Sequence, residues 1–118
     1  MTKRELIDYC LTLPMAYEDY PFEPVGAAMR HTGNKKIFAY ISESERGLKL
    51  VYKAHPTKIQ FWRDQFEAVK PAFHWNKEYW NEVYVNEVEF DSARLMILDS
   101  YDLIKPKLKR RNTTSPAP

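Results

Sequence analysis

Residues 36–53 read KIFAYISESERGLKLVYK, two runs in which apolar and polar side chains alternate, separated by a polar segment that ends in glycine. Alternation with a period of two is typical of strands, and a polar connection with glycine is typical of a hairpin. We therefore predict strands at 36–42 and 47–53. A third strand at 25–31 is joined to them through Gly33 and Asn34, which tolerate positive φ.

Strand 36–42 is predicted to present two different faces. Ile37, Ala39 and Ile41 are expected to point to one side, and Phe38 and Tyr40 to the other. Only one of these sets can pack against a helix layer. The other set leaves the back of the sheet partly exposed, which makes that face a candidate binding site.

Three helices are predicted around these strands. The first covers 3–13, with Thr2 and Glu5 forming a capping box and Pro14 ending it. The second begins at Pro56, and the third runs from a cap at Asp91 to near Lys105, before Pro106. Their apolar stripes are Ile59, Trp62, Phe66 and Val69 in the second helix, and Ala93, Ile97, Tyr101 and Ile104 in the third.

The order of elements predicts a two-layer α+β domain. Residues 15–24, MAYEDYPFEP, are interpreted as irregular, and residues 80–85 as a further strand. Tight hairpins imply an antiparallel β-sheet, with the N-terminal, middle and C-terminal helices packed on one face. Residues 1–105 are expected to form a single domain, and 106–118 a basic, Ser/Thr/Pro-containing flexible tail.

Composition excludes several classes of protein. The chain has 118 residues, 44% of them hydrophobic, and no uncharged apolar stretch long enough to span a membrane. The single cysteine favours a reducing, cytoplasmic location, and we expect a monomer. Only three glycines are present, and no nucleophile or phosphate-loop motif, so we expect no enzyme, no catalytic residues and no cofactor. Cys10 lies on the apolar stripe of the first helix and is expected to be buried.

The charge is unevenly distributed along the chain. Residues 1–104 contain 13 basic and 16 acidic side chains, so this part is acidic on balance, although the whole chain carries +2. The remaining five basic residues lie between Lys105 and Arg111. Attraction for nucleic acid would therefore require a local basic patch or the tail.

Residues 73–83, FHWNKEYWNEV, are rich in aromatic residues and contain both histidine and lysine. Asn76 suits an N-cap that accepts from the amide of Glu78 or Tyr79, and Trp80 suits ordinary packing. His74, Trp75 and Lys77 precede the strand and are free to face a ligand. Lysine contacts a phosphate as a point charge, and the rings of histidine or tryptophan stack on bases.

Five segments in this order resemble the MmcQ/YjbR family of small bacterial proteins. PFHWNKEYW resembles the family signature YHMNKxHW, in which His74, Asn76, Lys77 and Trp80 match and Phe73, Trp75 and Tyr79 are replacements. The other four segments are LPMAYEDYPF at 13–22, KIFA at 36–39, Lys53 with Pro56, and SYDLI at 100–104. The resemblance covers roughly residues 2–108. Met15 and Glu23 stand where the family has glycine.

The resemblance implies a CyaY-like (frataxin-type) α+β fold with a double wing, and DNA as the partner. We expect DNA contacts from Lys35, Lys36, Lys49, Lys53, His74, Trp75 and Lys77. The alternative is a protein-interaction or small-ligand module that uses Phe38, Tyr40 and Trp75. A weaker alternative is metal handling by Glu18, Asp19 and Glu23; the histidines His31, His55 and His74 lack ligand spacing, and no metal site is assigned.

Overall fold

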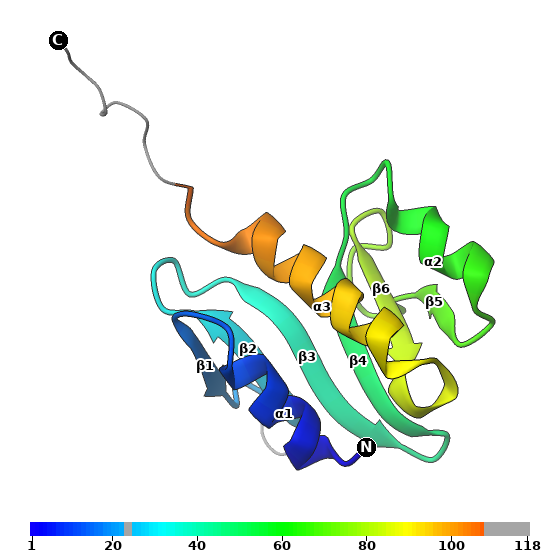
Figure 1. Cartoon of the computed structure of the whole chain (residues 1–118), viewed down its shortest axis with the longest axis horizontal. Helices are drawn as coiled ribbons and strands as arrows, with labels where there is room; N and C mark the ends of the chain where they lie inside the picture. The colour runs from blue at the N-terminus through cyan, green and yellow to red at the C-terminus, as the bar shows by residue number, and fades with distance from the viewer. Residues whose placement is uncertain (23–24, 108–118) are drawn as a thin grey trace, which may run out of the picture.

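The computed structural model describes residues 1–22 and 25–107, in which an antiparallel sheet is covered on one face by helices (Figure 1). The strand order is β1-β2-β3-β4-β6-β5. The strands are β1 (Ala16–Asp19), β2 (Gly26–His31), β3 (Ile37–Ser44), β4 (Gly47–Lys53), β5 (Val69–Pro71) and β6 (Trp80–Tyr84). The helices are α1 (Lys3–Leu11), α2 (Ile59–Gln65), the 3-10 turn η1 (Val85–Glu87) and α3 (Phe90–Ile104).

The hairpin predicted from residues 36–53 is confirmed as β3–β4. Ser44 pairs with Gly47 at the turn, and β4 has the predicted bounds. Gly47 has a φ of 137°, a backbone conformation that L side chains rarely adopt, so the turn requires glycine. The first hairpin, β2–β3, also forms, but the positive φ in its turn, 62°, is at Lys35 and not at Gly33 or Asn34.

A β-bulge in β3 contradicts the predicted faces of that strand. Met29 pairs with Ala39 and Arg30 pairs with Ile37, so Phe38 is the extra residue on β3. Because a bulge interrupts the alternation, Phe38 turns into the main core while Ile37 joins the opposite face. The prediction that Phe38 and Tyr40 share the back of the sheet is therefore wrong for Phe38.

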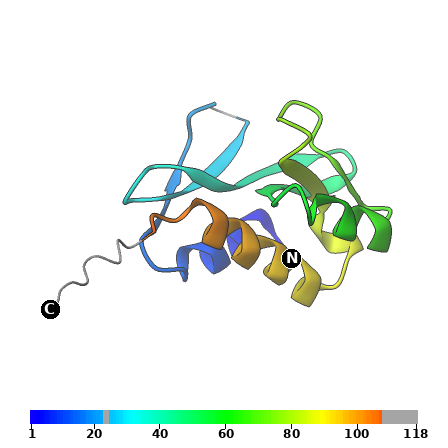
Figure 2. The ribbon, with the colours of Figure 1, turned by 90° about the horizontal axis from the view of Figure 1, so that it is seen from above.

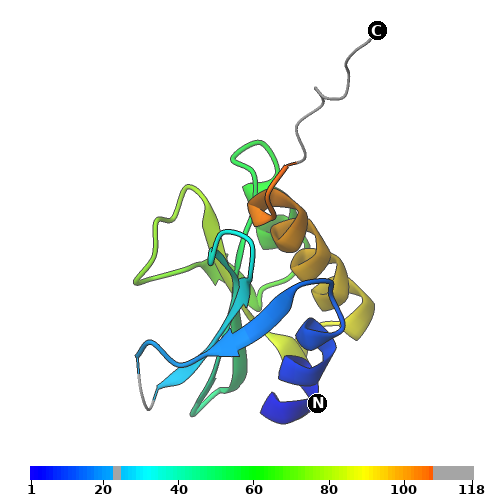
Figure 3. The same cartoon turned by 90° about the vertical axis from the view of Figure 1, so that its left-hand side faces the viewer.

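Helices α1 and α3 cover the same face of the sheet, as Figures 2 and 3 show. The capping box of Thr2 and Glu5 is present, and Cys10 is buried on the core-facing side of α1. All four residues of the predicted α3 stripe are buried, and the helix ends at Ile104 as expected. Helix α2 contacts β5 at the edge of the sheet.

Several boundaries differ from the prediction. Residues 16–19, interpreted as irregular, form the edge strand β1, and Val69, assigned to the second helix, begins β5. Such short edge strands carry too few residues for their alternation to be recognised. Helix α2 begins at Ile59 instead of Pro56, and α3 begins before Asp91.

Two further expectations concern the C-terminal tail and the absence of a membrane-spanning segment. The predicted tail, 106–118, lies outside the described residues beyond Lys107, as does Glu23. Within the described part, no helix combines the length and the apolar character needed to cross a bilayer.

Candidate functional site

The face of the sheet opposite α1 and α3 is hollowed into a groove of about 510 Å³. The β5–β6 connection and the described parts of the β1–β2 connection rise on this side of the sheet (Figure 2). We call this hollow the sheet groove. Its apolar lining is Phe22, Val25, Ile37, Tyr40, Val51 and Trp75, and its polar lining is Ser42, Lys49, His74 and Glu82.

Aromatic rings form a continuous series in the sheet groove. The ring centroid of Tyr40 lies 5.9 Å from that of Phe22 and 5.7 Å from that of Trp75. Trp75 is in turn supported by Trp80 at 4.6 Å. The back-of-sheet site predicted from Tyr40 and Trp75 is thus brought together by the fold, with Phe22 in place of Phe38.

The polar groups of the sheet groove are incompletely satisfied. Tyr40 and Ser42 are 7% and 6% exposed, and neither hydroxyl has a hydrogen-bond partner among the described residues. Burial raises the pKa of Tyr40, so this hydroxyl keeps its proton and can donate. Lys49, a predicted DNA contact, lies 3.9 Å from the carboxylate of Glu82, and this pairing offsets its charge.

The loop between β5 and β6 turns Trp75 toward the sheet. The side-chain oxygen of Asn76 accepts from the amide of Glu78 at 2.9 Å, which confirms the predicted cap. Arg63 of α2 donates to the carbonyl of Lys77 at 2.7 Å and so holds the loop in place. His74 and Lys77 stay exposed, and the ammonium of Lys77 lies 5.5 Å from the ring of Phe73.

Four of the five predicted lysines have no ion pair within the described part of the chain: Lys35, Lys36, Lys53 and Lys77. Lys53 pairs with Trp80 across β4 and β6, and Tyr52 pairs with Ala39 across β4 and β3, so the start of β3, the end of β4 and the start of β6 lie at the same end of the sheet. The ammonium of Lys53 lies 5.9 Å from the rings of Tyr79 and Trp80. We call these four lysines the lysine end.

Two of the three acidic residues in the metal alternative, Glu18 and Asp19, do not converge on a common site. Glu18 and Asp19 are consecutive residues of β1 and point to opposite faces. Arg4 binds Glu18 at 2.8 Å and lowers the pKa of that carboxyl, while Arg30 binds Asp19 at 2.8 Å. No cluster of three or more histidine, cysteine or acidic residues suitable for a metal occurs in 1–22 or 25–107.

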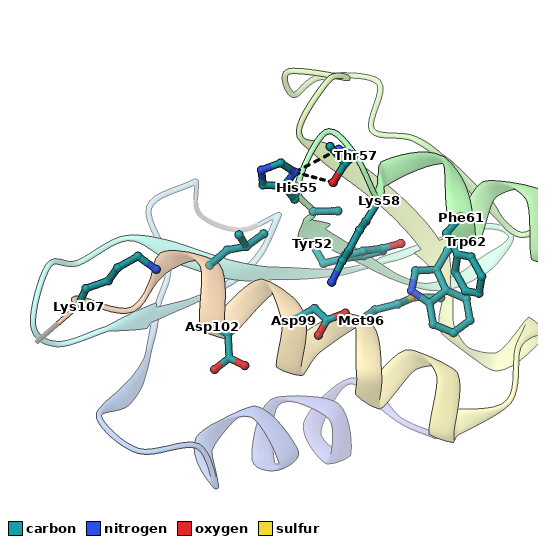
Figure 4. Close-up of a pocket in the computed structure, with 12 residues that line it drawn as sticks. Tyr52, His55, Thr57, Lys58, Phe61, Trp62, Met96, Asp99, Asp102 and Lys107 are labelled. Carbon is teal, nitrogen blue, oxygen red and sulfur yellow. Dashed lines mark hydrogen bonds between the residues drawn. The ribbon is translucent and has the colours of Figure 1, made fainter.

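A second cleft, of about 670 Å³, lies between α2 and α3 on the helix side (Figure 4). Trp62 and Phe61 form one end, and Lys58 and Asp99 point toward one another from opposite sides. The sequence did not indicate this cleft, because Trp62 fitted the apolar stripe of a core helix. Tyr52, at its floor, already accepts a hydrogen bond from Asn81 at 3.0 Å.

Cys10 provides a test of the buried face. Burial raises the pKa of its thiol to about 12, so we expect no labelling by iodoacetamide in the folded protein below about pH 10. The unfolded thiol ionises near pH 9, and the folded one retains its proton, so this group makes stability fall as pH rises above that value. Mass spectrometry after labelling with and without urea measures the fraction of Cys10 that has reacted. Rapid labelling without urea would contradict the burial of α1 against the sheet.

Comparison with known proteins identifies relatives of the whole domain. A family model described as YjbR matches residues 11–103. A crystal structure from Pseudomonas syringae has a TM-score of 0.79 and 25% identity, covering 89% of this chain and all of the other. A Deinococcus radiodurans protein with a DUF419 domain has a TM-score of 0.80 and 22% identity, covering 94% of this chain and 86% of its own. No curated protein matches.

Proposed function

The chain belongs to the YjbR family, and on that premise we propose that it is a non-enzymatic DNA-binding protein. The two wings of the proposed double wing are the β2–β3 and β3–β4 hairpins, which carry Lys35, Lys36, Lys49 and Lys53. Phosphates contact the lysine end, and bases contact His74 and Trp75 beside it. The observation that carries the proposal is a set of four lysines without ion pairs among the described residues, two of which, Lys53 and Lys77, lie near aromatic rings.

The distribution of ion pairs supports this proposal despite the acidic balance of the domain. Arginines take up most of the paired carboxylates: Arg4 binds Asp8 and Glu18, and Arg46 binds Glu67 and Glu87. The lysine end therefore keeps its charge available. A solvated lysine contributes to phosphate binding through release of counterions, so binding should weaken with salt. Lys49 belongs to this surface only if the ligand displaces Glu82.

Charge reversal at the lysine end tests the proposal. We expect Lys36→Glu with Lys77→Glu in the full chain to weaken binding of a labelled duplex at least about tenfold near 0.15 M salt. The slope of log K against log salt should become shallower by about one for each phosphate that is no longer neutralised. Fluorescence anisotropy at several salt concentrations measures both quantities.

Two control variants make the result specific. Lys3→Glu with Lys58→Glu changes the net charge equally at sites away from the lysine end, and affinity should change much less. A variant with glutamine at Lys109, Arg110 and Arg111 tests the tail. If only this tail variant loses affinity, the folded domain does not read DNA and the proposal is wrong.

The sheet groove favours a second candidate, a small-ligand or protein-interaction module. The specific observation is the concave, largely apolar lining around Tyr40 and Trp75. A groove of about 510 Å³ is within the range of small-molecule sites. Trp75→Ala would abolish binding in this candidate, whereas the charge reversal at the lysine end would leave it intact.

A further inference from the structure

The walls of the sheet groove are suited to a flat ring. Tyr40 is held between Phe22 and Trp75, and each neighbouring ring is tilted against it. Phe22 is 56% exposed, so one face of this ring is open. Trp75 is only half-buried, yet Trp80 supports it from behind at 4.6 Å. Exposed aromatic surface at fixed positions favours stacking on a planar ligand.

The floor of the sheet groove carries unused hydrogen-bonding groups. Tyr40 and Ser42 are more than nine-tenths buried, and their hydroxyls lack partners among the described residues. Buried polar groups without partners are rare in native proteins, because each forgoes the hydrogen bonds it had in water. Glu82 and Lys49, 3.9 Å apart, add an acceptor and a donor that are too distant to bond to one another.

Gly26 shows that the position of Tyr40 depends on close packing. A Cβ atom at Gly26 would lie 2.6 Å from the carbonyl oxygen of Ile41 and 3.0 Å from Cζ of Tyr40. The phenol ring of Tyr40 therefore occupies space that a side chain at position 26 would need. Ser42 pairs with Gly26 across β2 and β3 and lies two residues after Tyr40, so both side chains are on the groove face of β3.

We propose that the sheet groove binds a planar heterocycle with a hydrogen-bonding edge, the chemistry of a purine or pyrimidine base. The ring would stack against Trp75 and Phe22, and its edge would meet Ser42, Tyr40 and the Lys49–Glu82 pair. An apolar ring alone would leave these polar groups unsatisfied. This proposal rests on the second candidate function, and it holds whether the base is free or part of a strand.

NMR titration of the ¹⁵N-labelled full chain tests the proposal. The probes are adenosine and cytidine, a ten-residue single strand of thymidine, and toluene as a ring without an edge. We expect shifts at the amides of Ser42 and Val51 and at the indole of Trp75. Ser42→Ala should weaken binding about fivefold and Trp75→Ala about tenfold or more, whereas Thr32→Ala, outside the groove, should have no effect.

Each outcome of the titration either supports the base-binding proposal or overturns it. Shifts with the nucleosides indicate a free ligand, and shifts with the strand alone indicate a base within nucleic acid; both support the proposal. The absence of groove shifts with every probe would overturn it, and so would toluene binding as tightly as the nucleosides or an unchanged affinity in Ser42→Ala. The variant with Lys36→Glu and Lys77→Glu should still bind nucleosides, which separates this proposal from duplex binding at the lysine end.

Discussion

Replacing Phe38 with alanine is expected to lower the free energy of unfolding by about 3–5 kcal/mol. Phe38 is fully buried, and its ring lies edge-on to Tyr101 of α3 at 5.3 Å. The substitution leaves a cavity between the sheet and α3, which the surrounding backbone can close only in part. Urea unfolding followed by circular dichroism measures the change, with the slope of the transition checked for two-state behaviour.

Ile37→Ala is the matched control for the bulge. Ile37 is half-buried and lines the sheet groove, so its truncation should cost about 1 kcal/mol. Uninterrupted alternation would exchange the environments of these two residues. Ile37→Ala costing more than Phe38→Ala would therefore show that β3 has no bulge and that the groove has a different floor.

The bulge explains why the strands of the β3–β4 hairpin were predicted correctly, whereas the faces to which Ile37 and Phe38 point were not. Ile41 and Tyr40 follow the period of two from the β3–β4 turn, and this part of the strand was predicted correctly. One extra residue at Phe38 reverses the faces of everything before it. The sequence KIFA at residues 36–39 does not distinguish a bulged strand from a regular one, because Ile37, Phe38 and Ala39 are all apolar and fit either face of the strand.

The candidate site was only partly predictable for a similar reason. Trp75 and His74 could be found, because a loop rich in aromatic residues just before a strand has few core positions to fill. Ser42 and Glu82 could not be found, because their importance comes from neighbours across the sheet and from the rings above them. Within the described part of the chain, arginines pair with acidic residues and the lysine end has no ion pair. The sequence did not show this either, because the ion pairs join segments that are distant in the chain.

Asn81 connects the sheet to the loop that carries Trp75. It is fully buried on β6, and its amide nitrogen donates to the hydroxyl of Tyr52 and to the carbonyl of Ile59, each at 3.0 Å. Its side-chain oxygen accepts from Arg63 at 2.6 Å. Arg63 in turn donates to the carbonyl of Lys77. One side chain thus joins β4, α2 and the β5–β6 loop.

Asn81→Ala is therefore expected to destabilise the protein by about 3–4 kcal/mol, since it leaves two buried groups unsatisfied and creates a cavity. Tyr52→Phe removes only one of these hydrogen bonds and should cost about 1 kcal/mol. Because Arg63 loses its anchor, amide exchange should accelerate in residues 72–79 more than in β2 and β3. Equal acceleration in both regions, or a destabilisation below that of Tyr52→Phe, would mean that Asn81 does not position the loop. The wall of the sheet groove would then depend on the contacts of Trp75 with Tyr40 and Trp80 and on the turn at Asn76.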